Sequence, residues 1–116
     1  MTIPSYIVTD PVLVDASTQA SSTVIYTVRS HGRVRFSGCT VGNKGSFNAP
    51  LYCYIGVYRE TDATVTEWEP IAPVYVPGGS VAPVAATVIL TPGDQLVAYA
   101  TTANTAVVTP ILEDIS

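Results

Sequence analysis

Short runs of alternating apolar and polar residues, separated by glycine, proline and asparagine, extend over most of the chain. Alternation places successive side chains on opposite faces of a strand, and no segment keeps a helical period for three turns. The sequence therefore predicts an all-β protein. We expect strands at residues 12–14, 23–29, 33–41, 51–59, 64–68, 71–76, 81–90, 95–101 and 106–112.

The clearest alternation lies in the decapeptide PLYCYIGVYR, residues 50–59. Leu51, Cys53, Ile55 and Val57 would form an aliphatic row on one face of the strand, and the other face would carry tyrosines. These are Tyr52, Tyr54 and Tyr58, with Gly56 between the last two. The aliphatic row suits a hydrophobic core, whereas the tyrosine row has no such obvious destination.

The number and spacing of the strands favour two packed antiparallel sheets in a jelly-roll-like sandwich. We expect one domain over residues 23–116. Residues 1–22 are predicted to form an extended N-terminal arm, because they contain two X-Pro pairs and a polar run at 16–22.

Composition narrows the partners that we expect. Charged residues make up only 12% of the chain, about half the usual content, so much of its surface is expected to be covered by another molecule. A net charge of −4 argues against general binding to nucleic acid. Apolar runs are too short to cross a bilayer, and the N-terminus lacks a signal-peptide pattern, so we expect no membrane and synthesis in a cytoplasm.

Residues suited to catalysis or metal binding are few. His31 lies in a predicted turn without a nucleophile motif, which favours an exposed turn residue over a catalytic base. Glu67 and Glu69 would share a strand face, which allows a small hydrolase as a remote alternative. Cys39 and Cys53 are interpreted as free thiols in preference to a disulfide. We expect no enzyme activity, no cofactor and no metal site.

Three groups remain as candidates for binding. Trp68 is interpreted as a core or interface anchor in preference to a sugar platform. Arg33 and Arg35 would share a strand face and pair with acidic groups of a partner or of the chain itself, in preference to phosphates. The tyrosine row is assigned to an interface, since buried tyrosine hydroxyls need partners, and burial inside the sandwich is the alternative.

Five short motifs are spread over about residues 23–115: IYTV at 25–28, VGNKGS at 41–46, LYCYIGV at 51–57, PGGSV at 77–81 and LTPGDQLVAYATTAN at 90–104. Together they resemble small β-sandwich structural proteins of tailed bacteriophage virions. This resemblance implies a non-enzymatic building block that is present in many symmetric copies.

Within that class, the small single domain favours a capsid decoration or cement protein over a tail or neck component. The resemblance implies a homo-oligomer in the virion, assembled in the host cytoplasm, that binds the major capsid protein or another virion protein. A receptor-binding or carbohydrate-binding module is the alternative from another class. The expected interface residues are Tyr52, Tyr54, Tyr58, Trp68, Arg33 and Arg35.

Overall fold

The computed structural model of the chain describes residues 5–29, 32–46, 49–61 and 65–115, with the backbone alone at 5, 60–61 and 65–67. These residues form strands and one short 3-10 turn, η1 (Gln19–Ser21), which confirms the all-β prediction. The strands are β1 (Ser5–Ile7), β2 (Val12–Val14), β3 (Thr23–Thr27), β4 (Val34–Asn43), β5 (Leu51–Thr61), β6 (Val65–Val76), β7 (Val81–Val84), β8 (Val88–Leu90), β9 (Gln95–Ala100) and β10 (Ala106–Asp114).

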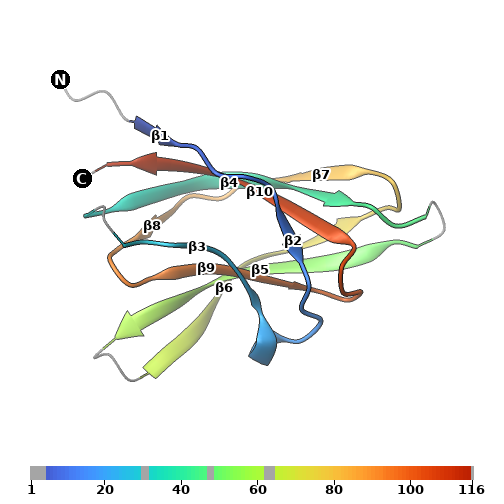
Figure 1. Cartoon of the computed structure of the whole chain (residues 1–116), viewed down its shortest axis with the longest axis horizontal. Helices are drawn as coiled ribbons and strands as arrows, with labels where there is room; N and C mark the ends of the chain where they lie inside the picture. Colours follow the sequence, from blue (N-terminus) through green and yellow to red (C-terminus); the bar gives the residue numbers. More distant parts are fainter. Residues whose placement is uncertain (1–4, 30–31, 47–48, 62–64, 116) are drawn as a thin grey trace.

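The strands form two antiparallel sheets that pack face to face (Figure 1). Sheet A has the order β1/β2, β10, β4, β7/β8, and sheet B has the order β3, β9, β5, β6. The pairs are nested: β5 pairs with β6, β4 with β7 and β8, β3 with β9, and β1 and β2 with β10. One long hairpin wrapped around the core gives this order, which is that of a jelly roll.

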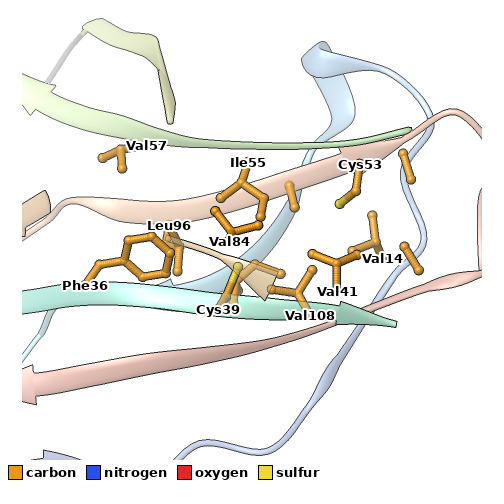
Figure 2. Packing of buried hydrophobic residues seen from close by; sticks show 14 of the residues in the cluster. Val14, Phe36, Cys39, Val41, Cys53, Ile55, Val57, Val84, Leu96 and Val108 are labelled. Carbon is orange, nitrogen blue, oxygen red and sulfur yellow. The ribbon is translucent and has the colours of Figure 1, made fainter. Parts of the chain in front are cut away.

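The core lies between the sheets and contains the aliphatic row of β5. Cys53, Ile55 and Val57 are completely buried and face residues of β4, including Phe36 and Val41 (Figure 2). Complete burial of each aliphatic or aromatic side chain stabilises the fold by about 1.5–3 kcal/mol. The predicted division of β5 into a core face and an outer face is therefore confirmed.

The N-terminal segment is more integrated than an extended arm. Ser5–Ile7 and Val12–Val14 both pair with β10, and Val14 is completely buried in the core. The strand at 12–14 was expected, whereas β1 was not, because three residues beside an X-Pro pair carry too little periodicity. The described part of residues 1–22 thus supplies one edge of sheet A.

Prolines interrupt the strands less than the sequence predicts. The expected break near Pro70 is wrong: β6 runs unbroken through Pro70 and Pro73 with one register shift. Because β6 is an edge strand, a missing N–H there need not remove a ladder hydrogen bond. The single strand predicted at 81–90 is instead divided into β7 and β8.

Gly38 explains how β4 pairs with both β7 and β8. Its φ is +113°, and a Cβ there would lie 2.5 Å from the carbonyl oxygen of Val84, so only glycine fits. The part of β4 that pairs with β8 ends at Phe36, and the part that pairs with β7 begins at Cys39. Gly38 lies between these two parts. Phe36 and Cys39 are therefore both buried in the core although they lie three positions apart.

Two polar side chains are buried among those that the structure describes, and they lie at opposite ends of β4 and its neighbours. Asn43 is the first. Its Nδ2 donates to the carbonyl oxygens of Ala49 at 2.9 Å and Val76 at 3.1 Å, and its Oδ1 accepts from Gly45 N at 2.8 Å. Asn43 therefore joins the ends of β4 and β6 to the connection that enters β5.

Asp94 is the second buried polar residue. Its Oδ2 accepts from Thr91 N at 2.9 Å and from Arg59 Nη1 at 2.7 Å, and its carbonyl oxygen accepts from Val28 N at 3.0 Å. Arg59 also donates to the carbonyl oxygen of Ile89 at 2.8 Å and to Glu69 Oε2 at 2.9 Å. This network joins β5 and β6 of sheet B to the connection between β8 and β9.

We expect Asp94→Asn to destabilise the protein because Arg59 would lose its most buried counter-charge. The loss should be about 2–3 kcal/mol, less than the about 3–5 kcal/mol typical of a broken buried pair, since Arg59 remains partly exposed and keeps Glu69. Urea unfolding measures it. The control is Glu113→Gln, which weakens a longer pair with Arg35 at 3.4 Å and should cost less than about 1 kcal/mol. Equal losses would contradict this account.

Both cysteines are free and buried, and they enter the core from β4 and β5, in different sheets (Figure 2). Burial raises the pKa of the Cys39 and Cys53 thiols to about 12, from a usual value of 9.0. Below pH 9 both thiols are protonated in the folded and the unfolded chain, so they do not reduce the stability. As the pH rises from 9 toward 12, the thiols ionise in the unfolded chain first, and the free energy of unfolding falls.

We therefore expect neither thiol to react with a thiol reagent at about pH 8 in the native protein, and both to react in denaturant. Between about pH 9 and 12, each thiol should lower the free energy of unfolding by at most about 1.4 kcal/mol per pH unit. The difference in this slope between the wild type and Cys39→Ala/Cys53→Ala isolates the thiols from other groups. Rapid labelling of the native protein would contradict the prediction.

Candidate interaction surface

The outer face of sheet B carries six aromatic side chains from three adjacent strands. β5 contributes three tyrosines, β6 contributes Trp68 and Tyr75, and β9 contributes Tyr99. Tyr52 is directly opposite Tyr75, Tyr54 opposite Tyr99, and Tyr58 opposite Trp68. The name aromatic face is used here for Tyr52, Tyr54, Tyr58, Trp68, Tyr75 and Tyr99.

The six rings are in continuous contact along this face. Tyr75 contacts Tyr52, with ring centroids 5.2 Å apart, and Tyr52 contacts Tyr54 at 6.5 Å. Tyr54 stacks on Tyr99 at 4.8 Å with an interplanar angle of 18°. Two rings so close and so nearly parallel must turn their faces toward each other. This pair therefore presents ring edges and hydroxyl groups to solvent.

Trp68 is held differently, with its indole ring over the backbone of β5. A Cβ at Gly56 would lie 2.5 Å from Cζ2 of Trp68, so the ring occupies the space above the glycine. Tyr58 contacts the indole edge-on, with centroids 5.8 Å apart, and Tyr99 contacts it at 5.5 Å. The gap that Gly56 leaves in the tyrosine row is thus filled by the tryptophan of the neighbouring strand.

The aromatic face is partly open to solvent and carries no charge. Tyr52 is 48% exposed and Tyr75 50% exposed, and the other four side chains are half-buried. Tyr58 donates its hydroxyl hydrogen to the carbonyl oxygen of Gln19 at 2.9 Å, which connects the face to η1. Among the described outward side chains of β5, β6 and β9, none is charged.

This arrangement supplies contact area and hydroxyl groups in a fixed geometry. Such groups are typical of protein interfaces, where aromatic side chains lose little conformational entropy when they are buried. A sugar ring, by contrast, packs on an open aromatic face, and Tyr54 and Tyr99 each turn one ring face toward the other. Trp68, in contrast, lies over the backbone of β5 at Gly56.

The two arginines that were predicted as interface residues do not lie on sheet B: Arg35 is in β4 of sheet A, and Arg33 directly precedes β4. Arg35 pairs through Nη1 with Oε2 of Glu113 on β10 at 3.4 Å, and Ser37 Oγ donates to the same carboxylate at 3.1 Å. Arg33 is exposed just before β4. The structure therefore brings Tyr52, Tyr54, Tyr58 and Trp68 together, and it places Arg33 and Arg35 away from them. An interface role for these six residues remains a prediction.

The structure describes only some of the residues that the sequence suggests for catalysis or metal binding. His31 and the side chain of Glu67 lie outside the described residues, while Glu69 is paired with Arg59. Among the described residues, no three His, Cys, Asp or Glu side chains are grouped to hold a metal ion. No helix in the described part of the chain has the length and hydropathy to span a membrane.

Sequence reasoning missed Tyr75 and Tyr99 as parts of the surface, and it placed Gly56 in the tyrosine row without recognising it as the position that Trp68 covers. Tyr75 and Tyr99 lie in predicted strands, but their position beside the β5 tyrosines depends on strand pairing, which the sequence does not reveal. The available signal was Gly56 itself, because a glycine inside a strand often marks a close approach by another group.

We expect Gly56→Ala to displace Trp68, because the new methyl group would overlap the indole. The predicted cost is about 1–3 kcal/mol, together with a changed emission spectrum of the chain's single tryptophan. Gly42→Ala is a matched control, since a Cβ there meets its nearest side-chain atom, in Val81, at 3.8 Å. Unchanged fluorescence in Gly56→Ala would show that Trp68 does not lie over β5.

Comparison with known proteins does not add a family to this geometry. No family model matches the sequence, and no curated protein matches it. The function of the chain is therefore inferred from the aromatic face and from the motifs in its sequence.

Proposed function

We propose that this chain is a non-enzymatic structural protein of a bacteriophage virion, which decorates the capsid and stabilises the shell by binding neighbouring subunits. The observation that carries the proposal is the aromatic face: six contacting rings on an uncharged, partly exposed sheet surface. The virion and its capsid are proposed from the resemblance of the sequence motifs. The proposed partner is the major capsid protein, without direct contact to nucleic acid or membrane.

The aromatic face suits a stable protein contact. Fully buried aromatic side chains contribute about 150–250 Å² each, and tyrosine and tryptophan dominate the energetically important positions of interfaces. Tyr52 and Tyr75 are each about half exposed, so these two side chains offer the most accessible area to a partner. The ring contacts hold the side chains in place before binding, so a partner orders few additional rotamers.

Repetition would multiply the effect of each contact. In a symmetric shell, every copy of a decoration protein meets the same surface of its neighbours. A subunit that contacts two shell proteins at once holds the second at a high effective concentration, so separation requires several contacts to break together. An uncharged face also gives such binding little dependence on salt.

Two alternatives use the same surface. A tail or neck component would bury the aromatic face against another virion protein. A receptor-binding module would bind a carbohydrate, and the flat placement of Trp68 favours that role at one position. The stacking of Tyr54 on Tyr99 favours a protein partner over the sugar, because one face of each of these rings is already covered by the other.

We expect Tyr52→Ser/Tyr75→Ser to reduce incorporation into particles at least about tenfold, because two open anchors of the face are lost. Copies per particle are counted after co-expression with the proposed partner, the major capsid protein of the same virion. Tyr6→Ser is the matched control: it removes a tyrosine, 71% exposed, from β1 in sheet A. It should leave incorporation unchanged.

Full incorporation of the double variant would show that the aromatic face does not bind the shell. Binding of the wild type to a glycan array, lost in Trp68→Ala, would instead establish the carbohydrate-binding alternative. Thermal unfolding of each variant confirms that the sandwich is intact before the comparison is made.

A further inference from the structure

The four outer edges of the two sheets differ in how they are protected. An exposed edge strand invites pairing with another chain, and proteins commonly prevent this with proline or an interruption. In sheet B, β6 carries Pro70 and Pro73. In sheet A, β7 carries Pro83, and the opposite edge is interrupted by residues 8–11, which include Pro11.

The fourth edge, β3, has neither a proline nor a break in the strand, and its one irregularity is a register shift against β9 between Val24 and Tyr26. Its sequence, TVIYT, contains no proline, glycine or charged residue, and β-branched and aromatic residues of this kind favour strands. β3 pairs on one side with β9 and forms the end of sheet B, at the near side of the molecule in Figure 1. On its outward face Val24 is 45% exposed.

We propose that β3 pairs antiparallel with β3 of a second copy of this chain, across a two-fold axis perpendicular to sheet B. The pairing would join two four-stranded sheets into one continuous sheet of eight strands. It uses the edge of the sheet and not the aromatic face, so it stands or falls independently of the proposed function.

A second copy fits this edge for two reasons. An antiparallel strand pair is self-complementary under a two-fold axis, so β3 offers its own copy the matching row of donors and acceptors. The chain has a net charge of −4, and β3 itself contains no charged residue, so no carboxylates on the paired strands would oppose each other. The Asp15 carboxylate at the start of β3 accepts a hydrogen bond from Thr23 Oγ1.

The size of the contact predicts a weak dimer in isolation. Five residues span about 17 Å of strand, so the edge buries much less than the about 800 Å² per partner of a standard interface. The arrangement has a further consequence for binding. Because the axis is perpendicular to the sheet, both aromatic faces would lie on the same side of the dimer and present two copies of the surface to one partner assembly.

Sedimentation of the wild-type protein over a range of concentrations tests the proposal. We expect reversible dimer formation by about 1 mM, with increased hydrogen-exchange protection of the β3 amides as the concentration rises. Val24→Lys should weaken the dimer at least about tenfold, because it brings two like charges to the paired edge. Val81→Lys is the matched control on β7, where the side chain is 67% exposed, and it should leave the dimer unchanged.

Each other outcome overturns the proposal. A wild-type protein that stays monomeric to about 1 mM shows that β3 does not recruit its own copy. A dimer that survives Val24→Lys but is lost in Tyr52→Ser/Tyr75→Ser shows that the copies meet through the aromatic face instead. Incorporation into particles is measured separately, so loss of the dimer with retained particle binding leaves the proposed function in place.

Discussion

The fold depends on how the chain passes from one sheet to the other at the two ends of the sandwich. At these passages the ladders stop, and backbone groups next to the core need hydrogen-bond partners that strands no longer supply. Asn43 provides them at one end and Asp94, with Arg59, at the other. Both hold β5 or its entry in place. The position of the aromatic face on the sandwich therefore depends in part on two buried polar side chains that do not belong to it.

The sequence predicts the parts of this fold that depend on a strand's own pattern. The period of two in β5 assigns Leu51 and Ile55 to the core and the tyrosines to the other face without knowledge of any neighbour. It does not distinguish edge strands from central ones, because that status depends on the whole sheet. Pro70 illustrates the limit: the same residue would end a central strand, and it is accommodated in β6 because one side of β6 is free.

The candidate surface shows the same division between local and non-local information. Tyr52, Tyr54 and Tyr58 can be grouped from one strand, and Trp68 can be suspected from its type. That Trp68 fills the gap above Gly56, and that Tyr75 and Tyr99 complete the row, follows from the register of β6 and β9 against β5. Arg33 and Arg35 were grouped with them by charge and type alone. Strand pairing places Arg35 on the other sheet, and Arg33 lies just before the same strand. Arg59, which the sequence marks only as the end of a strand, proves to be the centre of a partly buried network.

The aromatic face serves the fold and the surface at once, and its members do so unequally. Tyr54, Tyr99 and Trp68 lie within the series of contacting rings, so each stabilises the outer side of sheet B through two neighbours. Tyr75 ends the series with a single ring contact, and it is one of the two most exposed members. The half-buried interior rings therefore supply rigidity, and Tyr52 and Tyr75, at one end of the series, supply open area for a partner. A surface built in this way is ordered before it binds, which lowers the entropic cost of association.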